Sequence, residues 1–161
     1  MRKGFFVLSF IIVYAPLYSQ EFARSKNKAT GELVITFADF REPPQIPVVV
    51  TKTIRHDDSA TYQIGCYLVR NSVSVDMFMK SGAILTFENK TNMTLDGDIR
   101  SSPIYGGKFQ IYIKQGISQA DLKLLQLAAI ESFEIGGFTV VINKWQRQDL
   151  KEVFIAIETA K

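Results

Sequence analysis

Hydrophobic and polar residues alternate along much of the first two thirds of the chain, and this period of two predicts β-strands. In the segment 33–37, for example, Leu33, Ile35 and Phe37 share one side. The same alternation, together with β-branched residues, predicts further strands at 48–54, 61–69, 73–80, 83–88 and 93–95. Most of the breaks between these segments are short, so we expect antiparallel hairpins, because parallel strands need long crossover connections.

The last third of the chain mixes strand and helix patterns. Ser118 can cap a helix and Asp121 follows three residues later, which is the spacing of a capping box. A stripe of apolar residues follows, so we predict a helix at about 119–129. Alternating apolar residues predict strands on both sides of this helix, at 109–113, 133–135 and 138–143.

A second helix is predicted to begin after Asn143, with Gln146 at the capping-box position. The apolar residues from Leu150 to Ile157 fit helical spacing, although 153–157 by itself also fits a strand. We favour a helix because residues 148–152 have good helix propensity and contain no helix breaker.

These elements together predict a single α+β domain over residues 32–161, with a mainly antiparallel sheet of about seven to eight strands. Two helices from the C-terminal half would cover one face of this sheet. The polar stretch 20–31 is expected to be a flexible arm, and 39–47, which holds three prolines, a loop or irregular edge. Residues 101–107 are also predicted to be a loop, because they contain Pro103 and two glycines.

The first nineteen residues have the three-part plan of a secretory signal peptide. Arg2 and Lys3 precede an apolar run at 5–14, and Ser19 is a small residue at the expected cleavage site. Ten apolar residues are too few to cross a bilayer, which takes about 20. We therefore expect export to the periplasm or the cell exterior, with no membrane span after cleavage. An uncleaved anchor and a buried N-terminal helix are the alternatives.

Signal cleavage also changes the charge balance. Without Arg2 and Lys3 the chain keeps 17 basic and 16 acidic residues, a net charge of +1. Nucleic-acid binding proteins concentrate basic residues on one face, whereas both signs are mixed along this chain, so we expect no nucleic-acid partner. An apolar content of 47% excludes an intrinsically disordered chain.

The chain has one cysteine, Cys66, and one histidine, His56. A single cysteine excludes a disulfide framework, and a single histidine excludes the multi-histidine zinc enzymes. Cys66 alternates with Ile64 and Leu68, so we expect it to face the core, and an intermolecular disulfide or a catalytic nucleophile is the alternative. The chain has no phosphate-binding glycine loop, nucleophile elbow or HExxH helix. We therefore predict no catalytic residue, metal ligand or cofactor.

Two loops are candidates for a binding site. His56, Asp57 and Asp58 have the composition of a polar hairpin turn, and the alternatives are a weak divalent-metal site and a catalytic role. Ile104 and Tyr105 lie between a proline and two glycines, where they could present an aromatic side chain to a ligand or partner. A plain connection is the alternative for this second loop.

The residues around the cleavage site, Tyr18-Ser19-Gln20, look like those of exported proteins of Bacteroidetes. Over residues 109–158 the order strand, helix opened by 117–122, two strands and final helix is similar to small exported proteins of unknown function in that group. This resemblance implies a compartment and a fold, and carries no activity.

We therefore expect a non-catalytic exported domain that binds a protein, glycan or envelope component. The alternative is a small hydrolase whose site is assembled from Asp, Glu, Ser and Tyr residues distant in the sequence. A third hypothesis is an assembly role, in which an open sheet edge pairs with another chain. The ligand and the oligomeric state stay open at this level.

Overall fold

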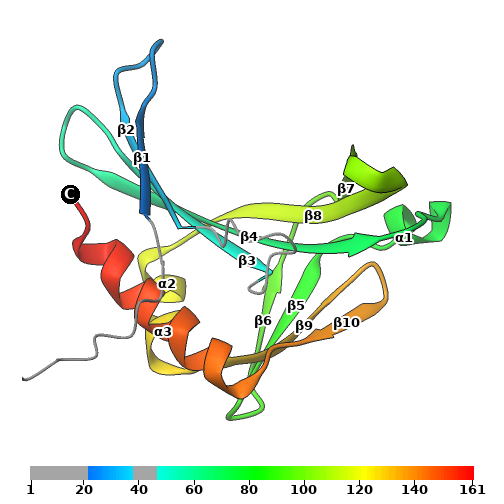
Figure 1. Ribbon diagram of the computed structural model, residues 1–161. Coiled ribbons are helices and arrows are strands. Elements are labelled where there is room, and N and C mark those ends of the chain that lie inside the picture. The colour runs from blue at the N-terminus through cyan, green and yellow to red at the C-terminus, as the bar shows by residue number, and fades with distance from the viewer. Residues whose placement is uncertain (1–21, 38–46) are drawn as a thin grey trace, which may run out of the picture.

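The computed structural model of this protein describes residues 22–37 and 47–161. In this part of the chain, ten strands form two antiparallel sheets, accompanied by three α-helices and one 3₁₀ turn (Figure 1). The predicted α+β class with mainly antiparallel strands is confirmed. The finer prediction of seven to eight strands and two helices is wrong. The predicted signal peptide, 1–19, and most of the proline-rich loop lie outside the described residues.

The larger sheet has six strands in the order β1-β2-β3-β4-β8-β7. Its long central pair is β4 and β8, whose register runs from Tyr62 opposite Ile117 to Arg70 opposite Phe109. The bounds of its strands are β1 Phe22–Lys26, β2 Leu33–Phe37, β3 Val48–Ile54, β4 Ala60–Arg70, β7 Arg100–Ile104 and β8 Lys108–Ile117.

The smaller sheet has four strands in the order β10-β9-β5-β6. Its strands are β5 Ala83–Phe87, β6 Asn92–Leu95, β9 Ile130–Ile135 and β10 Phe138–Val141. The β9–β10 hairpin turns at Gly136 and Gly137, which both have positive φ angles, 59° and 84°. A two-residue turn with two positive φ angles matches the twist of a hairpin, and this requirement explains why both positions are glycine.

The helices are α1 Val75–Met79, α2 Gln119–Leu127 and α3 Lys144–Thr159. The predicted capping box of α2 is confirmed, since the Asp121 backbone N–H donates to Ser118 Oγ at 3.1 Å and the Ser118 N–H donates to the Asp121 carboxylate at 3.0 Å. The helical prediction for 153–157 is also confirmed. Among the described residues, none of the helices has the length and apolar character needed to cross a bilayer.

The core lies where the two sheets and the two longer helices meet. Helix α3 packs against β2 and β3 of the larger sheet, β9 of the smaller sheet, and α2. Figure 1 shows α2 and α3 together on one side of the molecule, away from α1. Fully buried side chains come from both sheets and both helices, among them Val50, Ile64, Ile113, Leu85, Phe133, Leu125 and Phe154.

The segment 73–80 corrects the sequence prediction, because its alternating pattern predicts a strand and the structure contains helix α1. The preceding strand β4 already has partners on both sides, β3 and β8, and the chain must next cross to the smaller sheet. A strand there would need new ladder partners, whereas a helical turn satisfies its own backbone groups. The Met77 N–H accordingly donates to the Ser74 carbonyl at 3.2 Å.

Two further segments contain strands where none was predicted. Residues 22–26, within the expected arm, form β1, whose backbone pairs with β2. Residues 101–104, within the expected loop, belong to β7, which pairs with β8 before the 3₁₀ turn η1 Tyr105–Gly107. Both segments are edge strands with mostly exposed side chains. Pro103 is compatible with this place because an edge strand has one side free of ladder bonds.

Candidate functional site

The predicted polar loop at His56 is the turn between β3 and β4. His56 Nε2 hydrogen-bonds with the Thr30 carbonyl oxygen in the turn between β1 and β2, so the ring joins two neighbouring hairpins. Gly31 has a φ of +71°, and a Cβ at this position would lie 2.9 Å from His56 Cε1. The close approach of this backbone to the imidazole therefore requires glycine.

The two aspartates beside His56 are turn residues. Asp57 Oδ1 accepts hydrogen bonds from the Ser59 hydroxyl at 2.6 Å and from the Ser59 N–H at 3.0 Å. These bonds lower the pKa of Asp57, because they stabilise its ionised carboxylate. Asp58 adopts a left-handed conformation with a φ of 60°. This pattern is that of an Asx turn, which shapes the loop.

The other two predicted site residues, Ile104 and Tyr105, lie at the far end of the larger sheet. The His56 turn precedes the first residue of β4, whereas Ile104 pairs with Lys108, next to Phe109 opposite the last residue of β4. At about 3.3 Å per residue, the 11 residues of β4 separate the two loops by about 30 Å. The structure therefore does not bring the two predicted loops together.

Around Ile104 and Tyr105 the structure exposes a group of large apolar side chains, which we call the apolar end. It consists of five residues from α1 and the β7–β8 hairpin, with the following exposed fractions: Val75 76%, Phe78 41%, Met79 80%, Ile104 38% and Tyr105 101%. Tyr105 begins the 3₁₀ turn at the hairpin tip. Helix α1 buries a single side chain, that of Met77.

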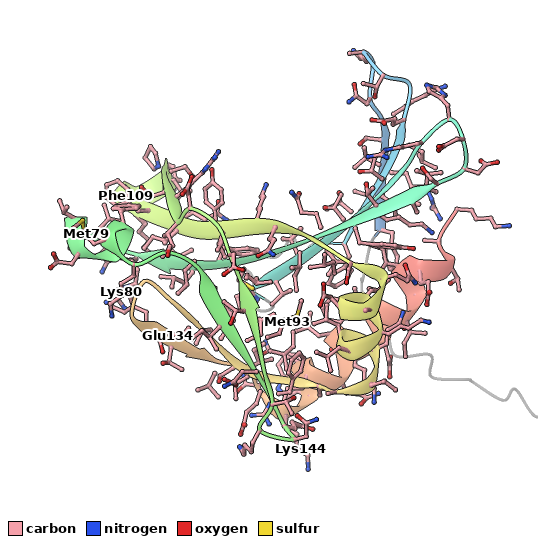
Figure 2. The ribbon with its side chains drawn as sticks, turned by 180° about the vertical axis from the view of Figure 1, so that it is seen from behind. Met79, Lys80, Met93, Phe109, Glu134 and Lys144 are labelled. Carbon is pink, nitrogen blue, oxygen red and sulfur yellow. The ribbon has the colours of Figure 1, made fainter. Side chains whose placement is uncertain are left out.

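Several contacts place these two elements at the same end of the molecule. The start of β8 lies opposite the end of β4 through the pair Phe109 and Arg70, and α1 begins five residues after Arg70. A Cβ on Gly136 would lie 3.4 Å from the side chain of Met77, so α1 packs on the β9–β10 turn. Figure 2 shows Met79 and Phe109 at one end of the molecule and Lys144, at the start of α3, far from them.

Sequence reasoning identified two of these five residues and missed the three on α1. A strand at 73–80 would have turned Val75 and Met79 toward the core, together with Met77. The one available signal was Phe78, a large aromatic residue on the face of that predicted strand that was otherwise polar.

Basic side chains outnumber acidic ones around the apolar end. The segments 69–80, 100–110 and 134–138 together contain four basic residues, Arg70, Lys80, Arg100 and Lys108, and two acidic ones, Asp76 and Glu134. Their net charge is +2, and the rest of the described residues, 22–37 and 47–161 without these segments, hold 12 basic and 11 acidic residues, a net charge of +1. The Arg70 guanidinium lies 4.3 Å from the centroid of the Phe138 ring.

A second cluster that the sequence analysis missed surrounds Lys52 on β3. Its Nζ donates to the carbonyl oxygens of Glu158, at 2.6 Å, and Ala160, at 2.8 Å, at the C-terminal end of α3. It also lies 5.9 Å from the centroid of the Tyr62 ring. Burial lowers the pKa of Lys52 and raises that of Tyr62, because both charged forms lose solvation.

This lysine has a structural task. The last carbonyls of a helix have no hydrogen-bond donors within the helix and carry partial negative charge. A lysine at this position donates hydrogen bonds to them and balances their charge. The signal was present in the sequence, since Lys52 continues the inward alternation of Val48 and Val50. The cluster therefore attaches the end of α3 to the larger sheet.

Cys66 lies fully buried in the central strand β4, as its alternation with Ile64 and Leu68 predicts. Burial raises the pKa of its thiol to about 12, so it remains protonated at neutral pH and is a poor nucleophile. Within residues 22–37 and 47–161, no three His, Cys, Asp or Glu residues gather in a way that could hold a metal ion.

Comparison with known proteins returned no relative: no family model, curated protein or solved structure matches this chain.

Proposed function

We propose that this protein is an exported, non-catalytic binding module that contacts a component of the cell envelope through its apolar end. The observation that carries the proposal is the joint exposure of five large apolar side chains on α1 and the β7–β8 hairpin. The proposal of export depends on the signal-peptide pattern of residues 1–19. The choice of the apolar end as the contact surface depends on the fold.

Exposed apolar side chains gathered in one place favour a contact role. Single exposed apolar residues are common on protein surfaces, whereas contiguous groups mark interaction sites. Val75 and Met79 are exposed to about the same degree as Leu127 at the end of α2, at 76%, 80% and 77%. What distinguishes the apolar end is that it includes Tyr105, the most exposed large apolar side chain among the described residues, at the tip of a hairpin.

The groups best suited to chemistry have structural tasks, which supports a non-catalytic role. His56 joins two hairpin turns, and Asp57 hydrogen-bonds within its own turn. Lys52 binds the end of α3, and Cys66 is buried with a raised pKa. A catalytic site would instead hold such groups in a shared concave pocket, in positions to reach a substrate.

Cosedimentation with envelope fragments tests this proposal. The protein would be purified from cells that express all 161 residues, and the purified N-terminus would be read by mass spectrometry. The test variant combines Val75→Ser, Met79→Ser and Tyr105→Ser, which removes the most exposed part of the apolar end. The matched control combines Leu127→Ser, Trp145→Ser and Ile155→Ser, which removes three exposed apolar side chains from α2 and α3.

We expect the wild-type protein and the control variant to sediment with the fragments, and the apolar-end variant to remain in the supernatant. All three proteins should give the same urea unfolding midpoint, so that a loss of binding is not a loss of folding. The proposal fails if the wild-type protein stays in the supernatant, or if the apolar-end variant sediments as the wild type does.

A further inference from the structure

We propose that the envelope component contacted by the apolar end is the surface of a lipid bilayer that carries anionic headgroups. This inference rests on the proposed function and names its partner. The shape of the apolar end, the types of side chain on it and the charges beside it all support a lipid surface.

The apolar end protrudes from the fold. Tyr105 is 101% exposed at the tip of a hairpin, and neither Gly106 nor Gly107 would bring a Cβ within 4 Å of another part of the protein. Val75 and Met79 likewise stand out from a helix of five residues. A stable protein partner would need a close-packed complementary face of about 800 Å² on each side. A bilayer surface adapts to separate protruding side chains and needs no such face.

The side chains at the tips suit the boundary between headgroups and acyl chains. Tyrosine is enriched at this boundary because its ring is apolar and its hydroxyl remains in water. Ile104 precedes Tyr105 in the hairpin, and Phe78 and Met79 supply further apolar surface from α1. Peripheral proteins bind membranes through limited apolar insertion of this kind, combined with electrostatic attraction.

The charge distribution favours an anionic bilayer over a neutral one. Arg70 and Lys80 flank α1 in the sequence, and Lys108 follows the hairpin tip, so basic groups border both apolar elements. All three side chains are exposed. Basic residues near a membrane surface are attracted to anionic lipids over about a Debye length. The four basic side chains around the apolar end, against two acidic ones, would favour an orientation with this end toward the lipid.

Sedimentation with protein-free vesicles tests the inference. Vesicles of phosphatidylcholine with about 30% phosphatidylglycerol are compared with vesicles of phosphatidylcholine alone, at low salt and at high salt, because salt screens the attraction. The variants are the apolar-end triple substitution above and a charge variant, Lys80→Glu with Lys108→Glu. The matched charge control is Lys123→Glu with Lys144→Glu, two exposed lysines on α2 and α3.

A tryptophan reporter adds a site-specific readout. Trp145 is the only tryptophan and lies at the start of α3, so a Trp145→Phe protein that also carries Tyr105→Trp reports on the hairpin tip alone. Insertion of the tip into the bilayer should shift this emission to shorter wavelength, and lipids brominated on the acyl chains should quench it.

We expect the wild-type protein and the charge control to bind anionic vesicles at least about tenfold more strongly than neutral ones, and high salt to remove most of this difference. The apolar-end and charge variants should each lose binding by about tenfold or more. Equal binding of the charge variant and the wild type would overturn the inference, as would a hairpin-tip reporter whose emission does not respond to vesicles.

The failure of this inference can be told apart from the failure of the proposed function. If the apolar end is needed for sedimentation with envelope fragments but the wild-type protein does not bind anionic vesicles, the lipid inference is wrong. The partner is then a protein or glycan. If the wild-type protein does not bind the fragments either, the proposed function itself is wrong.

Discussion

Helices α1 and α3 use their apolar side chains in opposite ways. Helix α3 buries Leu150, Val153, Phe154 and Ile157 against both sheets and α2, and Lys52 binds its C-terminal carbonyls. Helix α1 buries Met77 and leaves its other large apolar side chains exposed, and no side-chain hydrogen bond caps its start. The buried apolar residues of α3 therefore stabilise the fold, whereas Val75, Phe78 and Met79 of α1 remain available for contact.

The sharpest test of this difference is a pair of phenylalanine substitutions. Phe154→Ala should lower the free energy of unfolding by about 3–5 kcal/mol, because it leaves a cavity in the core beside both sheets. Phe78→Ala should cost less, about 1–2 kcal/mol, because Phe78 is 41% exposed and only part of its ring is removed from water. Urea unfolding of the two variants measures both values. Equal costs would mean that α1 is part of the core and would remove the contrast.

The attachment of α3 to the larger sheet should show the next largest effect. Lys52→Met keeps the aliphatic stem and removes both hydrogen bonds to the end of the helix. We expect a loss of about 1–2 kcal/mol in the free energy of unfolding, because two partly buried carbonyls lose their donor. Lys123→Met, on the exposed face of α2, is the control and should change stability by less than about 0.5 kcal/mol.

Alkaline pH should weaken the packed region through Cys66. The ordinary pKa of this thiol is 9.0, and burial raises it to about 12 in the folded protein. Because the pKa of the thiol is higher in the folded than in the unfolded protein, its contribution to the free energy of unfolding is fully present below pH 9. This contribution is lost as the pH rises from 9 toward 12. Between about pH 8 and about pH 10 the wild type should lose about 1 kcal/mol more of its free energy of unfolding than Cys66→Ala does.

Urea unfolding of the wild type and Cys66→Ala at several pH values checks this difference. A thiol reagent gives an independent reading, because the native protein should not react until it unfolds. Rapid labelling of native protein at about pH 8, where the unfolded thiol already reacts, would show that Cys66 is accessible and would contradict its assignment to the core.

The smallest effect on stability is expected at the hairpin tip. Tyr105→Ser should change the free energy of unfolding by less than about 0.5 kcal/mol, since the side chain is 101% exposed. The same substitution should weaken sedimentation with anionic vesicles severalfold. Leu127→Ser, with a similar effect on exposed apolar surface, should leave vesicle binding unchanged. A Tyr105→Ser protein that is destabilised would show that the tip packs against the fold.

Segments with a strong local signal were predicted well. Strand β3 was predicted with its observed bounds, 48–54, because seven residues rich in valine and threonine lie between a proline and a polar turn. Helix α2 was predicted because Ser118 and Asp121 make a capping box whose contacts are only three residues apart. Such signals persist in the fold because they depend on neighbours in the sequence.

The errors fall where partners distant in the sequence decided the outcome. Residues 22–26 are polar and exposed, and only pairing with β2 makes them a strand. Residues 73–80 alternate as a strand does, yet the chain must there leave β4 for the other sheet. The same holds for the apolar end. Ile104 and Tyr105 were predicted from their loop, whereas Val75, Phe78 and Met79 were missed because they lie on α1.

The sequence by itself determined the α+β class, the antiparallel hairpins, the two long helices and the burial of Cys66, because periodicity and capping act through neighbouring residues. Tertiary structure alone decided that the strands divide into two sheets, that Lys52 contacts the end of α3, and that α1 lies at the same end of the molecule as the β7–β8 hairpin. These features depend on contacts between segments far apart in the chain, and the spacing of residues along one segment carries no information about them.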